Sequence, residues 1–262
     1  MRKIIAIINQ KGGVGKTTTS INFAAGLARK GFKTLLIDLD PQAHSTIGVG
    51  LLSMSEDSLE QPRSFNATID DVLTKKTPLK EAILATGTKN LFAVASEIKL
   101  EMTEQQYINS EVFRESLLKK ALGTVEDEFD YVVIDCRPTL GNLTINALYA
   151  ANFIIIPSEM GRYSLEGFSD LMGSISKVKN GKVNKTDLVR ILLTKFDNRK
   201  RIVNEWVMGQ LEPYREILFS TTIRMNEALN QSQIVQQTIF DFKPDSPGAQ
   251  DYENLINEFL SI

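Results

Sequence analysis

Residues 11–18 read Lys11-Gly12-Gly13-Val14-Gly15-Lys16-Thr17-Thr18, and this segment sets the architecture of the chain. An apolar run, Lys3–Asn9, precedes it, and a run with apolar residues at helical spacing, Thr17–Lys30, follows it. A strand, a glycine loop and a helix in this order form a phosphate cradle, because the glycines let backbone N–H groups turn toward an anion and the helix N-terminus adds positive potential. Glycines beside a lysine also occur in ordinary turns, but the flanking strand and helix favour the cradle.

Two side chains of this loop carry the predicted chemistry. Lys16 is expected to reach the β- and γ-phosphates of a nucleotide, and the Thr17 hydroxyl is expected to hold Mg²⁺. The usual form of the loop has glycine where this chain has Gln10, and an additional lysine, Lys11, follows it. The loop therefore departs from the common pattern at its first residues.

Length and composition favour a single globular domain over residues 1–262. The chain has 262 residues, of which 42% are hydrophobic and 24% charged, as is typical of an α/β protein with one core. A single cysteine, Cys136, excludes an internal disulfide or a cysteine-rich metal site and fits a reducing cytoplasm. The apolar run Ile4–Ile8 is too short for a signal peptide or a membrane span. We therefore expect a cytoplasmic protein without N-terminal targeting.

Basic residues are concentrated in one part of the chain, although the formal net charge is only −2. Residues 177–201 contain nine lysines and arginines against two aspartates, a formal charge of +7, whereas the rest of the chain carries −9. A local basic surface binds the DNA backbone without reading its sequence, through release of counterions. A solvated helix-and-loop face explains such a charge run equally well, so both interpretations stay open at this point.

Apolar runs alternate with amphipathic runs along the chain. The runs that read as buried strands are Lys3–Asn9, Lys33–Asp38, Asn90–Ala95, Asp130–Asp135, Asn152–Pro157 and Leu188–Thr194. The runs with helical spacing are Thr17–Lys30, Glu111–Leu122, Leu143–Ala150, Ser164–Val178 and Arg199–Leu211. Continuous apolar strands are typical of parallel sheets covered on both faces, so we predict an α/β fold with a doubly wound, mostly parallel sheet.

Two further segments are distinctive. Ser53–Asn66 is polar and lacks periodicity, so we predict a surface loop there. The tail Ser246–Ile262 has the spacing of a closing helix, with four large apolar residues on one face, Tyr252, Leu255, Ile256 and Phe259. Its polar face carries acids and no lysine or arginine, which anionic lipid would repel. We therefore expect this helix to dock on the protein core and not on a membrane.

Three aspartates follow predicted strands. Asp38 and Asp40 end one strand two residues apart, so alternation along an extended backbone points both side chains the same way, toward the phosphate loop. Asp135 ends another strand and is an acid of the kind that secures the metal in phosphate-loop proteins. Because the carboxyl ends of parallel strands meet at one edge of the sheet, the three acids and the glycine loop predict a metal-nucleotide site.

Longer motifs surround these residues. The string Asn9-Gln10-Lys11-Gly12-Gly13-Val14-Gly15-Lys16-Thr17-Thr18-Thr19, followed by Asp38-Leu39-Asp40-Pro41-Gln42, resembles the ParA/Soj branch of the deviant Walker-A ATPases, which partition plasmids and chromosomes. The resemblance continues through Asp135-Cys136, Thr144-Ile145-Asn146-Ala147-Leu148, Leu165-Glu166-Gly167, Leu193-Thr194 and Ser246-Pro247-Gly248-Ala249. It therefore covers most of the chain in order and spacing.

The resemblance implies a role for each site residue. Lys11 is similar to the family's signature lysine, which reaches across a face-to-face dimer to the partner's ATP. Asp40 would position the hydrolytic water, and Asp38 and Asp135 would serve the Mg²⁺ shell beside Thr17. The phosphates would lie on residues 11–18. The adenine would lie between the segment after Thr194 and the segment around Ile223, Arg224 and Asn226.

The chain departs from the family pattern at several positions. Arg137 replaces the first of two prolines after the Asp-Cys pair, either loosening the turn or adding a cation near the nucleotide; we interpret it as a tolerated loop change. Arg199 matches one arginine with which family members bind DNA, but another falls on Ala228. The candidate DNA contacts are Lys195, Arg199, Lys200, Arg201 and Arg224. His44 is interpreted as a polar turn residue ahead of a helix that begins at Ser45, and Cys136 as a buried free thiol.

The expected function is that of a cytoplasmic Mg-ATP switch, nucleoid-associated when ATP-bound. ATP would close a homodimer, the dimer would bind DNA non-specifically, and a ParB-like or small centromere-binding protein would stimulate a slow hydrolysis. The early phosphate loop leaves no room for an N-terminal DNA-reading domain, so operator binding is not expected. Three alternatives are a membrane-cycling ATPase similar to MinD, an orphan relative that positions a protein cargo, and a ligase resembling dethiobiotin synthetase.

Overall fold

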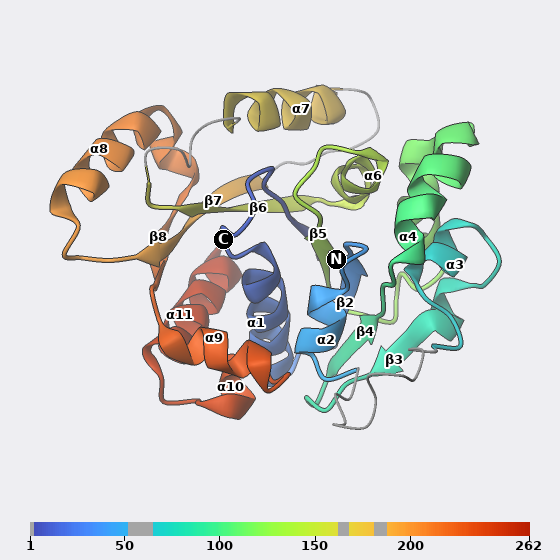
Figure 1. Ribbon diagram of the computed structural model, residues 1–262, viewed down its shortest axis with the longest axis horizontal. Helices are drawn as coiled ribbons and strands as arrows, with labels where there is room; N and C mark the ends of the chain where they lie inside the picture. Colours follow the sequence, from blue (N-terminus) through green and yellow to red (C-terminus); the bar gives the residue numbers. More distant parts are fainter. Residues whose placement is uncertain (1–2, 52–64, 162–167, 181–187) are drawn as a thin grey trace.

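The computed structural model describes residues 3–51, 65–161, 168–180 and 188–262. Within these residues one sheet of eight strands runs in the order β3-β4-β2-β5-β1-β6-β7-β8 (Figure 1). Its strands are β1 (Lys3–Ile7), β2 (Thr34–Leu39), β3 (Ile83–Ala85), β4 (Leu91–Val94), β5 (Tyr131–Cys136), β6 (Phe153–Glu159), β7 (Leu188–Phe196) and β8 (Leu218–Arg224).

The strand pairings are parallel except at one edge. β1 pairs in parallel with β5 and β6, and only β3 and β4 are antiparallel among the pairings described. The central strands are buried on both faces, as in β2, where every residue is buried. These pairings confirm the predicted doubly wound, mostly parallel sheet. The strands are apolar along their whole length because helices cover both faces of the sheet.

Helices cover both faces of the sheet (Figure 1). One face packs on α3 (Ile69–Leu73), α5 (Leu117–Gly123), α6 (Asn142–Ala150), α7 (Phe168–Asn180) and α8 (Arg201–Leu211). The other packs on α1 (Lys16–Arg29), α9 (Glu227–Ile234), α10 (Ile239–Phe242) and α11 (Pro247–Ser261). Short α2 (His44–Gly48) and α4 (Lys99–Met102) lie beside the carboxyl edge, and α4 continues into the π-helical turn η3 (Thr103–Tyr107).

Most predicted elements appear within a few residues of their expected bounds, as boundary conventions allow. The start predicted for the helix over Glu111–Leu122 is wrong. The helix α5 begins only at Leu117, after a 3-10 turn, η5 (Arg114–Ser116). Phe113 has φ 59°, a left-handed conformation that interrupts a helix. The surface loop predicted over Ser53–Asn66 lies mostly outside the described residues. The first four residues of the predicted helix Ser164–Val178 also lie outside them.

The closing helix is confirmed as α11. The Ser246 side chain caps it by accepting a hydrogen bond from the Ala249 N–H, and the four large residues of its apolar face are buried in the core. Its acids bind the protein as well: Asp251 pairs with Arg224 at 2.7 Å, and Glu258 accepts the Ser220 N–H at 2.6 Å. Among the described helices, none has both the length and the apolar character needed to cross a bilayer.

Candidate nucleotide-binding site

The glycine loop joins β1 to α1 at the carboxyl edge of the sheet. Gly13 and Gly15 have φ of 74° and 87°, left-handed backbone conformations that residues with a Cβ rarely adopt. Gly15 is the N-cap residue of α1, and no side chain caps this helix end. The N–H groups of the first turn of α1 are therefore available to an anion, as the sequence predicts for a phosphate cradle.

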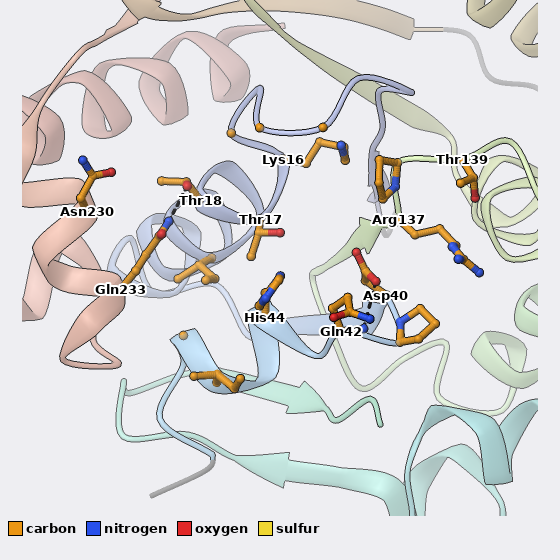
Figure 2. A pocket seen from close by; sticks show the side chains of 18 of the residues that line it. Lys16, Thr17, Thr18, Asp40, Gln42, His44, Arg137, Thr139, Asn230 and Gln233 are labelled. Atoms are coloured by element: carbon orange, nitrogen blue, oxygen red, sulfur yellow. Dashed lines mark hydrogen bonds between the residues drawn. The ribbon is translucent and has the colours of Figure 1, made fainter. Parts of the chain in front are cut away.

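A cavity of about 670 Å³ opens over this loop. Lys16 and Thr17 face Asp40 across it, with Asn230 and Gln233 at one end, and Arg137 and Thr139 at the other (Figure 2). The predicted site residues that line the cavity are Gly12, Gly13, Gly15, Lys16, Thr17, Thr18, Asp40 and Lys195. Segments from six separate parts of the chain therefore converge on one site.

Lys16 is a buried cation at the floor of this site. Its side chain is 7% exposed, and its ammonium donates a 2.9 Å hydrogen bond to the Lys11 carbonyl oxygen. Burial lowers the pKa of Lys16, and the nearby charge of Asp135 opposes that shift. A buried ammonium with one backbone acceptor is a strong anion-binding group, because few competing ligands satisfy its remaining donors.

Lys11 has a different environment. Its ammonium lies 3.8 Å from Glu159 at the end of β6, and the Lys11 side chain is 32% exposed. Its backbone N–H donates to the Asn9 side chain at 3.0 Å, and Asn9 in turn donates to the Pro157 carbonyl at 2.7 Å. These bonds fix the start of the loop against β6, and Lys11 does not line the cavity of its own chain.

Asp135 and Asp38 lie beneath the loop as buried carboxylates. Asp135 accepts hydrogen bonds from Ser20 at 2.8 Å and Ser45 at 2.9 Å. Burial raises the pKa of Asp135 to about 7, the charge of Asp38 adds to that, and hydrogen bonds from Ser20, Ser45 and Thr17 oppose it. The Thr17 hydroxyl therefore lies near enough to affect the pKa of the acid with which it was predicted to share a metal ion.

Asp38 and Asp40 separate at the end of β2. Asp38 does not line the cavity; its carboxylate accepts bonds from the Thr46 N–H at 2.8 Å and the Thr46 hydroxyl at 2.7 Å. Burial raises the pKa of Asp38 to about 6 against these bonds. Asp40 faces the cavity, where its carboxylate accepts the Gln42 N–H at 3.0 Å (Figure 2). Only the second acid is placed to touch a bound ligand directly.

The end of β7 touches the loop from the other side. The Thr194 hydroxyl donates a 2.8 Å hydrogen bond to the Val14 carbonyl, which ties β7 to the cradle. The next residue, Lys195, has φ 51° and lines the cavity, at a point where the register with β8 shifts. An irregular strand end of this kind redirects a side chain, which here faces the cavity.

The segment expected beside the adenine lies at the end of β8 and the start of α9. Ile223 is buried in the core, Arg224 binds Asp251, and Asn226 caps α9 by accepting the Ala228 N–H. None of these three predicted residues lines the cavity. Asn230 and Gln233 of α9 line it instead, and the Gln233 amide donates to the Thr18 hydroxyl. No motif in the sequence marks these two polar residues of a short helix.

The predicted basic surface is only partly described, because Lys182, Lys185 and Asp187 lie outside the described residues. Arg199 is 87% exposed but pairs with Asp197 at 2.8 Å, and bonds from Arg199 lower the pKa of Asp197 to about 2. Lys200 and Arg201 are exposed and make no ion pair within the described part of the chain. Lys195 is likewise exposed and without an ion pair among the described residues, but it lines the cavity.

Three residues with open interpretations are now placed. Arg137 keeps an ordered turn: its guanidinium pairs with Glu104 at 2.6 Å and Glu101 at 2.9 Å. His44 begins α2, one residue earlier than predicted, and lines the cavity. Cys136 is a buried free thiol, as predicted, and burial raises its pKa.

Comparison with known proteins identifies relatives that span the whole chain. Residues 2–189 match a family model described as an AAA domain. The chromosome-partitioning ATPase Soj of Treponema pallidum is 34% identical over 261 residues, which cover 100% of this chain and 98% of that protein.

Two solved structures are also similar. One is from Mycobacterium smegmatis, named cobyrinic acid a,c-diamide synthase, with a bound ATP analogue and magnesium; it is 28% identical, with a TM-score of 0.81 over 99% of this chain and 95% of that one. The other, from Borrelia burgdorferi B31, is described as a plasmid partition protein bound to AMPPNP. It is 25% identical, with a TM-score of 0.80 over 100% of this chain and 99% of that one.

Proposed function

This chain belongs to the ParA/Soj family of partition ATPases, and from that premise we propose that it is an Mg-ATP-dependent dimerising ATPase. In this proposal ATP closes a homodimer, the dimer binds DNA non-specifically, and a ParB-like or small centromere-binding protein stimulates hydrolysis. The protein works in the cytoplasm and associates with the nucleoid when ATP-bound. The cargo is a plasmid or a chromosome.

One observation carries the proposal: the buried ammonium of Lys16 and the uncapped first turn of α1 face the same cavity as Asp40. Positive groups on one wall bind phosphates, and an acid on the opposite wall orients a water molecule. The cavity, at about 670 Å³, is within the usual size range for a site that takes a cofactor. Phosphate binding and water orientation therefore have candidate groups on opposite walls of one cavity.

Mg²⁺ fits the residues beside the loop. The Thr17 hydroxyl and the carboxylates of Asp135 and Asp38 are oxygen donors, the class that Mg²⁺ prefers, and Mg²⁺ takes its remaining ligands from water and phosphate. We propose that Thr17, Asp135 and Asp38 would hold the ion. When bound, the ion neutralises charge that develops on the phosphates.

Dimerisation is assigned to Lys11. Its ammonium stays out of its own cavity and pairs only weakly with Glu159, at 3.8 Å, since partly exposed ion pairs contribute little. This arrangement leaves Lys11 available for the nucleotide of a second copy. A bound triphosphate sensed by two subunits makes the closed dimer depend on ATP.

DNA binding is assigned first to Lys200 and Arg201 at the start of α8. Their charges are exposed, whereas Arg199 and Arg224 each bind an aspartate and Lys195 lines the cavity. Phosphate contacts from such residues give affinity without sequence preference. The five candidates therefore divide into two free cations, two compensated ones and one that faces the proposed nucleotide site.

Other functions find less support. A membrane-cycling ATPase similar to MinD needs a basic terminal helix, whereas the acids of α11 bind Arg224 and the β8 backbone. A metabolic ligase is the second candidate, because the similar Mycobacterium smegmatis structure is named cobyrinic acid a,c-diamide synthase. An orphan ATPase that positions a protein cargo would share all of the chemistry described above.

The deciding experiment measures ATP turnover and mass together. We expect slow hydrolysis that rises with DNA plus the centromere-binding partner, and a dimer by light scattering with ATP and Mg²⁺ but not with ADP. A crystal structure with AMPPNP should place Lys11 of each subunit against the nucleotide of the other. Turnover that responds to a small carboxylate and not to DNA would favour the ligase and contradict the proposal.

A further inference from the structure

We propose that Arg137 is a positioning residue that shields the phosphate-binding cavity from two glutamates in and behind its wall. This inference rests on the proposed ATP site and explains how that site tolerates nearby acids. Glu101 lines the same cavity as Lys16 and Asp40, so its carboxylate lies in the wall of the proposed phosphate-binding cavity. An uncompensated carboxylate there opposes triphosphate binding, because like charges repel strongly near a low-dielectric protein wall.

Arg137 neutralises this wall through two ion pairs. Its Nη1 lies 2.6 Å from Glu104 Oε2, and its Nη2 lies 2.9 Å from Glu101 Oε2. The Arg137 side chain is 18% exposed and that of Glu104 is 11% exposed, whereas Glu101, which lines the cavity, is 38% exposed, so salt reaches the cavity side of the cluster. The guanidinium points away from Lys16 (Figure 2). In this geometry Arg137 forms ion pairs with the two glutamates and does not itself enter the phosphate cradle.

The position of Glu104 is fixed by the fold. Its Oε1 accepts the Leu143 N–H at 3.0 Å, in the first turn of α6, where a carboxylate is stabilised by the helix dipole. A Cβ on Gly141 would lie 2.5 Å from the same oxygen, so the loop between β5 and α6 packs directly on this carboxylate. Glu104 therefore remains beside the cavity whether or not Arg137 is present.

This arrangement gives the replacement of a family proline by Arg137 a physical reason. A proline at this position would leave Glu101 and Glu104 as two unpaired negative charges beside bound phosphates. The energetic effect is electrostatic, so it grows with the charge of the ligand and shrinks as salt is added. A purely structural role for Arg137 would instead weaken all ligands of the cavity alike.

The test compares nucleotides of different charge. Arg137→Gln should weaken ATP binding about tenfold, ADP binding less and AMP binding least, by calorimetry in Mg²⁺ buffer at low salt, with smaller differences at high salt. Arg215→Gln is the matched control, because it removes the same charge from an exposed pair with Glu212 outside the cavity. Equal losses for all three nucleotides would overturn the proposal.

Rescue separates shielding from direct contact. Adding Glu101→Gln and Glu104→Gln to Arg137→Gln should return ATP affinity to within about threefold of the wild type, because no unpaired acid remains. If the triple variant stays as weak as Arg137→Gln, Arg137 contacts the nucleotide itself and the shielding role is wrong. Glu101→Gln alone, at a 38% exposed side chain, should tighten ATP binding, and unchanged affinity there counts against the proposal even if other variants misfold.

Failure of the ATP site is distinguishable from failure of this inference. A wild-type protein that binds none of the three nucleotides would overturn both. The shielding role alone would be overturned by three results together. The wild type would bind ATP, Lys16→Ala would not bind it, and Arg137→Gln would lose the same affinity for all three nucleotides.

Discussion

Asp38 and Asp135 are register partners on the neighbouring strands β2 and β5, and both are almost completely buried at the carboxyl edge of the sheet. Five hydrogen-bond donors from Ser20, Ser45, Thr46 and the Asp40 backbone surround the pair. Two adjacent buried carboxylates oppose each other's ionisation, which a bound cation would relieve. Ionisation of the pair is therefore unfavourable in the metal-free protein.

This relationship predicts how stability depends on pH. The pKa of Asp135 rises from 3.8 in the unfolded chain to about 7 in the folded protein, so between those values the folded protein binds more protons than the unfolded chain. The free energy of unfolding should therefore fall as pH rises through this window. Asp135→Asn, which cannot ionise, should be more stable than the wild type at about pH 8, by on the order of 1–3 kcal/mol, and similar at about pH 4.

Urea denaturation in EDTA at several pH values measures this difference. Asp127→Asn, at an exposed acid outside the cavity, is the control and should follow the wild type at every pH. Parallel pH profiles for the wild type and Asp135→Asn would show that Asp135 keeps an ordinary pKa in the folded protein.

Nucleotide binding should depend on Lys16. Lys16→Ala removes the buried ammonium from the floor of the cavity and should weaken Mg-ATP binding at least about a hundredfold, because hydrogen bonds to charged groups contribute on the order of 3 kcal/mol. Lys30→Ala, which removes the same charge from the other end of α1, should bind ATP normally. Calorimetry with ATP checks both variants, and unchanged affinity in Lys16→Ala would place the phosphates elsewhere.

The sequence predicts the cradle well because its signals are local. The glycine loop, the apolar strands and the α1 pattern each occupy a short segment with a clear period. β8 was missed because its exposure alternates irregularly at the sheet edge, and β3 because it has only three residues. Such elements are determined by their neighbours in the fold more than by their own residues.

The site shows the same division between local and distant determinants. Lys16, Thr17 and Asp40 were predicted from motifs and line the cavity together. The pairing of Arg137 with Glu104 joins residues 33 positions apart, and the bond from Gln233 to Thr18 spans 215 positions. No spacing rule connects such residues, because chain topology alone brings them together.

DNA binding should depend on the free cations at the start of α8. The double variant Lys200→Ala, Arg201→Ala should lower affinity for random-sequence duplex DNA in the presence of Mg-ATP. It should also reduce the slope of log affinity against log salt by about 2, since each phosphate contact contributes about 0.9. Lys80→Ala, at an exposed lysine paired with Glu128, is the control and should leave the slope unchanged. An unaltered slope in the double variant would move the DNA surface away from α8.

ATP hydrolysis should depend on Asp40, whereas ATP binding should not. Asp40 faces the cavity opposite Lys16, and its loss removes the acid proposed to orient water while leaving the cradle intact (Figure 2). Asp40→Ala should therefore bind ATP but hydrolyse it on the order of 10²-fold more slowly, so that the ATP-bound dimer accumulates on DNA. Light scattering with ATP and phosphate release measure the two effects, with Asp245→Ala as an exposed control outside the cavity. A variant that stays monomeric with ATP would contradict this role, because the triphosphate would then persist without closing the dimer.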